Sequence, residues 1–145
     1  MVDTKSFIKW LNYSERDLKS LNDSIKFNTS YNEDYCYKAH QVIEKLFKAY
    51  IIKKACELKR THDTFKLCRY CREYNEMFKD FDEGCSFIDK FYIGARCPQE
   101  DELIALDSDV ERIVKFVNDV YNKVEPLVRE ENDGVQENLF DKIVR

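Results

Sequence analysis

Positive charge is the feature of this sequence that points most directly to chemistry. The segment 38–72 carries ten Lys and Arg against three Asp and Glu, although the net charge of the whole chain is −4. Lys and Arg attract the phosphate backbone of a nucleic acid without reading its bases. Lys45, Lys48, Arg60 and the later Arg96 are therefore candidate phosphate-binding residues. The alternative is that the segment is only a solvated helix face, which is what most basic segments are.

Two histidines, His40 and His62, are the side chains suited to proton transfer near neutral pH. Either one would act as an acid or base only if the fold brought it within about 3 Å of the reacting atom, directly or through one water. The structural alternative places His62 at the start of a helix and His40 at the edge of the core. Arg96 and His62 are the two candidate catalytic residues.

Six cysteines raise the question of a metal site. Cys68 and Cys71 have the C-x-x-C spacing that zinc uses, and Cys85 or Cys97 would have to complete four ligands. The pair lies within a helical apolar pattern, and no second C-x-x-C exists, so buried, reduced thiols are the favoured interpretation. We expect no metal and no cofactor.

Length and composition predict one all-α domain in the cytoplasm. A chain of 145 residues is one domain in size, and its three Gly and two Pro are too few for the turns of a sandwich or barrel. No apolar run reaches the roughly 18 residues of a membrane span, and the first ten residues lack the apolar centre of a signal peptide.

Apolar residues recur at spacings of three and four, which predicts an up-and-down bundle of four to five helices over residues 1–129. The first expected helix spans residues 5–26, and the second runs from a Ser30–Glu33 capping box to residue 55. The third runs from Thr61 to Phe81, and the fourth follows a break at Gly84 and ends at Arg96. The fifth begins at Ser108. Glu44 and Lys48 should form a surface pair. Residues 130–145 read as an acidic, flexible tail.

Four segments carry a recognisable order and spacing. They are Ser14-Glu15-Arg16-Asp17-Leu18, Ala39-His40-Gln41-x-x-Glu44-Lys45-x-x-Lys48-Ala49, Thr61-His62-Asp63 and Tyr92-Ile93-Gly94-Ala95-Arg96-Cys97-Pro98. In this order they resemble the HEPN domain family over about two thirds of the chain. The resemblance implies a helical bundle that usually forms homodimers, is often encoded beside a minimal nucleotidyltransferase, and in many members is an RNase toxin.

The sequence departs from the nuclease members of that family at one motif. Those members carry an Arg followed, after four to six residues, by a His, and the pair lies at the dimer cleft. Here Arg96 is present, but no His follows it, and Cys97 stands where the family commonly has Tyr. RNA cleavage without a metal needs an acid, a base and positive charge, and the sequence supplies only the charge at this motif.

The favoured interpretation is therefore a non-catalytic or weakly catalytic HEPN protein that acts by dimerisation and by binding a nucleotidyltransferase partner, a nucleotide or RNA, as in a toxin–antitoxin pair. A homodimer also fits the aromatic content of 14%, since a lone bundle buries only some of such large side chains. Two alternatives stay open. One is a metal-independent RNase toxin with a displaced catalytic residue, and the other is a plain protein-interaction module.

Overall fold

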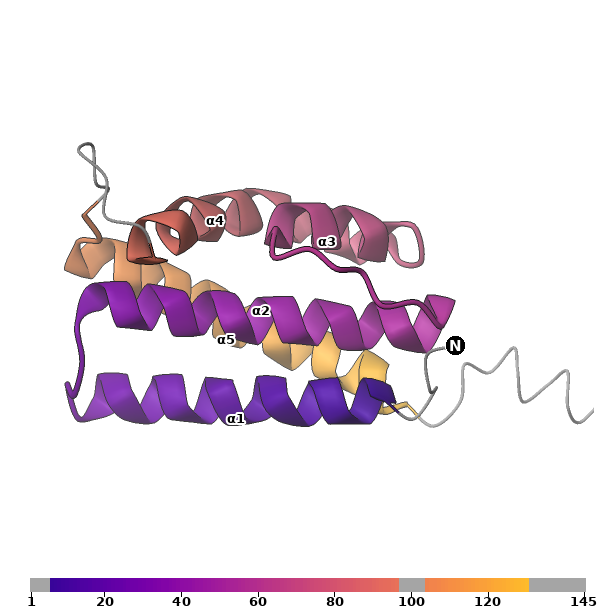
Figure 1. Ribbon diagram of the computed structural model, residues 1–145, viewed down its shortest axis with the longest axis horizontal. Coiled ribbons are helices and arrows are strands. Elements are labelled where there is room, and N and C mark those ends of the chain that lie inside the picture. Colours follow the sequence, from indigo (N-terminus) through magenta and orange to yellow (C-terminus); the bar gives the residue numbers. More distant parts are fainter. Residues whose placement is uncertain (1–5, 97–103, 131–145) are drawn as a thin grey trace, which may run out of the picture.

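A computed structural model describes residues 6–96 and 104–130, with only the backbone of residues 93–96. This part of the chain is all-α, as predicted, and consists of five α-helices and one 3-10 helix (Figure 1). The elements are α1 (Ser6–Lys26), α2 (Asn32–Ala55), α3 (Thr64–Arg72), η1 (Glu76–Phe81), α4 (Asp82–Arg96) and α5 (Asp107–Arg129). None of the described helices is both long and apolar enough to cross a membrane. The predicted tail begins where α5 ends, and residues 131–145 lie outside the described part.

Helix α2 is the centre of the bundle. It contacts α1, α3, α4 and α5, and Figure 1 shows α1 antiparallel to it on one side, with α3 and α4 following one another along the other side. Fourteen of its 24 residues are buried. A helix that is enclosed in this way has buried residues around most of its circumference rather than on one face.

The third predicted helix is shorter than expected. Helix α3 ends at Arg72, and the side chain of Asn75 then accepts a hydrogen bond from the Met77 amide (2.9 Å) to start η1. Phe78 and Phe81 are nevertheless buried as the apolar pattern requires, because the two short helices keep them against α2. Phe78 meets Phe47 of α2 edge-on, with ring centroids 5.4 Å apart.

Two of the predicted helix starts are displaced, and at each an aspartate accepts a hydrogen bond from a free amide in place of Thr61 or Ser108. Helix α3 begins at Thr64 rather than Thr61, because the Asp63 carboxylate accepts from the Lys66 amide (3.0 Å). Helix α5 begins at Asp107 rather than Ser108, and the Asp109 carboxylate accepts from the Leu106 amide (3.0 Å).

The capping box predicted at the start of α2 does not form. The Ser30 hydroxyl donates to the carboxylate of Asp34 instead. Tyr31 is the N-cap residue, and its side chain makes no capping hydrogen bond. The start of α2 is held by Asn32, whose side-chain amide donates to the Ala105 carbonyl (3.0 Å) before α5.

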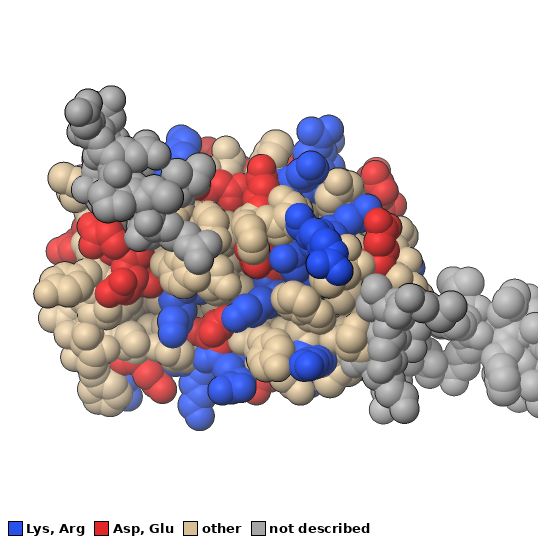
Figure 2. Space-filling model, viewed as in Figure 1, with Lys and Arg blue, Asp and Glu red and all other residues tan. Residues whose placement is uncertain are grey.

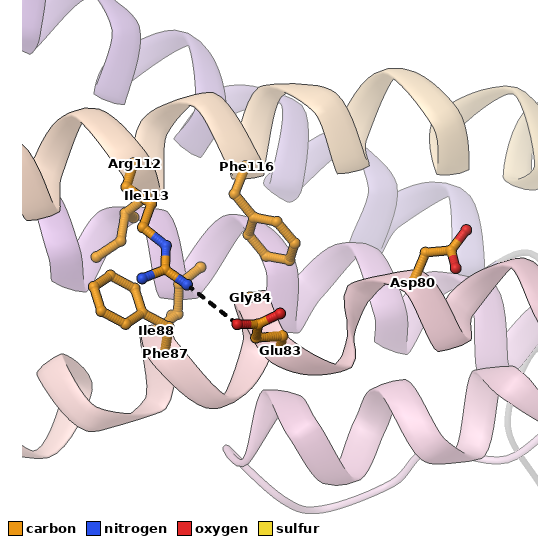
Figure 3. Close-up of a pocket in the computed structure, with 8 residues that line it drawn as sticks. All are labelled: Asp80, Glu83, Gly84, Phe87, Ile88, Arg112, Ile113 and Phe116. Atoms are coloured by element: carbon orange, nitrogen blue, oxygen red, sulfur yellow. Dashed lines mark ion pairs between the residues drawn. The ribbon is translucent and has the colours of Figure 1, made fainter.

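Gly84, predicted as a break, lies inside α4 and permits a close approach to α5. A Cβ atom at Gly84 would lie 2.2 Å from Cε1 of Phe116, and Figure 3 shows the two residues facing each other. Beside them is a pocket of about 220 Å³, where the Arg112 guanidinium lies 3.9 Å from the centre of the Phe87 ring. The glycine is therefore a packing residue, and the helix continues through it.

We expect Gly84→Ala to destabilise the protein by about 1 kcal/mol, because overpacking costs about 1–3 kcal/mol and the better helix propensity of Ala returns up to about 1 kcal/mol. Urea unfolding measures the change. In a Phe116→Ala background the same substitution should become stabilising, because the ring that it meets is gone. An equal effect in both backgrounds would contradict the close approach of α4 and α5.

Candidate functional site

Three polar residues form a row along the central helix. His40, Glu44 and Lys48 follow one another at intervals of four residues, so they lie on one face of α2. The three residues are almost fully buried, with exposed fractions of 0%, 4% and 5%. Glu44 and Lys48 are therefore a buried pair, and the predicted surface pair is wrong. A charge that is removed from water must be paired, and so the partners of this row determine the local structure.

The Glu44 carboxylate has two partners. One oxygen accepts from the Lys48 ammonium (Nζ–Oε2 3.3 Å), and the other lies 3.0 Å from Nδ1 of His62. An ionised carboxylate only accepts hydrogen bonds, so Nδ1 of His62 carries the hydrogen and its Nε2 is left for another partner. The His62 side chain is 67% exposed. Glu44 thus orients an exposed imidazole, an arrangement that also positions histidine bases in enzymes.

His40 is part of the core and not of its edge. Its Nε2 lies 3.1 Å from Oδ1 of Asp89, and its ring stacks on Tyr92, with centroids 3.8 Å apart. Its Nδ1 has no hydrogen-bond partner in the described structure and lies 3.8 Å from Oε1 of Glu44. A fully buried ring under Tyr92 does not reach solvent, so His40 holds α4 to α2.

Asp89 connects α4 to the first turn of α3. Its carboxylate accepts from the Thr64 amide (3.0 Å), the Thr64 hydroxyl (2.8 Å) and the Phe65 amide (3.0 Å). Burial opposes ionisation, but the hydrogen bonds to the carboxylate, of which those from His40 and the Phe65 amide have the largest effect, together outweigh it and lower the pKa of Asp89. Asp89 is therefore an anion at neutral pH, and it satisfies the free amides at the start of α3.

A pocket of about 280 Å³ opens beside the exposed ring of His62. We call it the Trp10 pocket, and its lining residues are Trp10, Lys48, Leu58, Lys59, Arg60 and His62. Helix α1 provides Trp10, helix α2 provides Lys48, and the connection between α2 and α3 provides the rest. The Lys48 ammonium lies 5.4 Å from the centre of the Trp10 ring. No carboxylate is among the lining residues, although Lys59 pairs with Glu57 nearby (2.9 Å).

The connection follows from the way α2 ends. Cys56 takes the left-handed conformation (φ 52°), and its amide donates to the Ile52 carbonyl (2.9 Å). This geometry stops the helix and redirects the chain. Residues 57–63 then pass beside α2 until His62 meets Glu44. The sequence predicts that the helix ends at residue 55, as observed, but it does not predict the left-handed turn at Cys56, because glycine is the usual residue in that conformation.

The structure brings together some of the predicted site residues. Lys48, Arg60 and His62 line the Trp10 pocket. Lys45 does not, because its ammonium pairs with Asp17 (2.5 Å) on the side of α1. Arg96 is the last residue of α4, and its side chain lies outside the described part. Figure 2 shows Lys and Arg gathered over α3 and the C-terminal half of α2.

The cysteines do not form a site in the part of the chain that is described. Cys68, Cys71 and Cys85 are buried, and burial raises the pKa of Cys71 and Cys85 well above the ordinary value. Such thiols stay protonated and pack as small apolar side chains. No group of three or more metal-binding side chains occurs among the described residues. Cys97, one of the possible fourth ligands, lies outside them.

We expect Glu44→Leu to destabilise the protein by about 3–5 kcal/mol, because it leaves the buried Lys48 ammonium without its partner. Chemical denaturation measures the loss. The double variant Glu44→Leu/Lys48→Met should recover most of it, to within about 1–2 kcal/mol of the original protein, since it removes both charges. If the double variant were as unstable as the single one, the cost would not come from an unpaired charge.

Comparison with known proteins identifies the family. The profile of the HEPN domain matches residues 8–127, which is most of the chain. Among solved structures, the crystal structure of TT1696 from Thermus thermophilus superposes with a TM-score of 0.70 at 20% identity, covering 83% of this chain and 97% of that one. A search of curated proteins gave no significant match. The matched helices include α2 with its buried polar row and the pocket beside it, and this chain belongs to the HEPN domain family.

Proposed function

We propose that the protein acts by binding, and that its ligand is a phosphate-bearing molecule, a nucleotide or RNA, held in the Trp10 pocket. The observation that carries the proposal is the lining of that pocket: Lys48, Lys59, Arg60 and His62 line it together with the indole ring of Trp10, and no described carboxylate is among the lining residues. Lys and Arg attract phosphate, and an indole offers a face on which a base can stack. Because the whole chain has a net charge of −4, this positive charge is a local property of the pocket and not of the chain as a whole.

The proposal also includes two protein partners, a second copy of the chain and a nucleotidyltransferase. A homodimer and a minimal nucleotidyltransferase, as in a toxin–antitoxin pair, are proposed from the family resemblance. Apolar side chains on the surface support a protein contact: Phe27, Tyr31, Ile104 and Leu106 are 60–78% exposed, on the turn between α1 and α2 and just before α5. Exposed apolar residues that gather on one surface usually mark an interface. The plain interaction module remains the interpretation if no phosphate ligand binds.

AMP should quench the fluorescence of Trp10, which is the only tryptophan of the chain and lines the pocket. In the variant Lys59→Gln/Arg60→Gln the dissociation constant should rise at least about tenfold, because a hydrogen bond to a charged group contributes about 1.5–3 kcal/mol and about 1.4 kcal/mol is tenfold. The matched control is Lys115→Gln/Lys123→Gln on exposed positions of α5, which removes the same charge elsewhere. If both variants weakened AMP binding equally, the Trp10 pocket would not be a specific site for AMP.

One observation favours a second candidate, the metal-independent RNase with a displaced catalytic residue. His62 is exposed, and Glu44 holds its Nδ1, so its Nε2 is available for proton transfer at the edge of the cationic pocket. His40 has no such access.

We expect the purified protein to degrade RNA no faster than its Arg96→Ala variant, because no His follows Arg96 in the sequence. Time courses with a labelled RNA and no added metal measure the rate. If the protein cleaved RNA robustly and both His62→Ala and Arg96→Ala abolished the cleavage, the RNase would be a better candidate than the binding protein.

A further inference from the structure

A second pocket lies next to the Trp10 pocket and is also basic. It has a volume of about 450 Å³ and is lined by Lys66, Arg69, Tyr70, Arg72 and Glu73 of α3 and the residue after it. Lys59 joins the two pockets, because it lines the first and its ammonium lies 4.3 Å from the centre of the Tyr70 ring in the second. The two pockets therefore share a border rather than lying on separate faces.

Two cations of the second pocket are free to meet a ligand. Arg72 is paired with Asp82 (2.5 Å), but Lys66 and Arg69 form no ion pair with any described residue, and both are exposed. They stand three residues apart on α3, on neighbouring positions of one helix face, about 4.5 Å apart along the axis. We call these two residues the α3 row. Unpaired exposed cations in a row favour an extended anion over a single phosphate.

We propose that the Trp10 pocket and the α3 row form one continuous surface that binds single-stranded RNA, with consecutive phosphates held by Arg60, Lys66 and Arg69. This inference rests on the proposed phosphate binding in the Trp10 pocket and names its substrate class. A mononucleotide would fill the Trp10 pocket and leave the α3 row unused. A strand uses both, and each pocket supplies an aromatic ring, Trp10 or Tyr70, beside its cations. Aromatic rings beside a basic groove are what single-strand binding needs, whereas an acidic peptide would use the cations alone.

The test compares AMP with an oligoadenylate RNA of about 12 nucleotides. Fluorescence quenching of Trp10 reports AMP, and anisotropy of a fluorescein-labelled oligoadenylate reports RNA. We expect RNA to bind at least about tenfold more tightly than AMP, because each additional phosphate contact releases counterions. The variant Lys66→Gln/Arg69→Gln should weaken RNA binding about tenfold and lower the salt slope by about 1.4, since each single-strand contact contributes about 0.7. AMP binding should not change, and Lys115→Gln/Lys123→Gln should bind both ligands normally.

Each other outcome overturns a defined part of the proposal. If AMP and RNA bind equally and the α3 variant changes neither, the strand surface is wrong and the proposed pocket stands. If AMP does not bind but RNA binds through the α3 row, the proposed pocket is wrong and α3 alone holds the strand. If polyglutamate with the same total charge as the RNA displaces it, and the Trp10→Leu variant binds RNA normally, the strand surface is wrong and the surface is a site for an acidic protein. If neither AMP nor RNA binds, both proposals fall.

Discussion

A carboxylate buried in the middle of the bundle determines the arrangement around it. Glu44 lies on the central helix with 4% of its surface exposed, and leaving it unpaired there would cost several kcal/mol. One partner, Lys48, comes from the next turn of the same helix, and the other, His62, comes from the connection between α2 and α3. The need to pair Glu44 therefore holds that connection beside α2. The Trp10 pocket exists because this connection brings Arg60 and Lys59 to Lys48 and Trp10.

The same polar row attaches the other layer of the bundle. His40, one turn before Glu44, meets Asp89 and Tyr92 of α4, and Asp89 also satisfies the free amides of α3. Polar contacts inside a core are directional, so they fix the positions of α3 and α4 along α2 more closely than apolar contacts alone. Tyr92 lies one turn before Arg96, the residue that the family resemblance places at a dimer cleft. The row thus runs along α2 from the last turns of α4 to the Trp10 pocket.

Much of the fold can be predicted from the sequence, because apolar spacing reports which residues face a core. The all-α class and the approximate helices follow from it. The helix starts are less predictable. At α3 and α5 the carboxylates of Asp63 and Asp109, rather than the predicted Thr61 and Ser108, accept hydrogen bonds from free amides. At the start of α2, Ser30 binds the Asp34 carboxylate and does not cap the helix. The prediction of a break at Gly84 is wrong because a glycine that terminates a helix and one that lets a second helix approach look alike in a sequence.

The candidate site is only partly predictable for a similar reason. Glu44 and Lys48 have the spacing of a surface ion pair, and this spacing is the same whether the helix lies on the surface or in the centre. The signal that distinguishes a central helix from a surface helix is the distribution of apolar residues around it. On α2 the apolar residues continue beyond one face, as at Val42, Phe47 and Ile51. The spacing of Trp10 fits the apolar face of α1 and predicts a core residue, but Trp10 is half-buried and lines the pocket.

Nitrogen NMR of the histidine rings tests the central role of Glu44 most directly. We predict that neutral His62 carries its hydrogen on Nδ1, because that nitrogen donates to the Glu44 carboxylate, and that Glu44→Gln shifts the ring towards the mixture of tautomers of an unrestrained imidazole. A His62 ring that already shows this mixture in the unaltered protein, with no change in Glu44→Gln, would contradict that role. The connection between α2 and α3 would then be held by something other than the buried carboxylate.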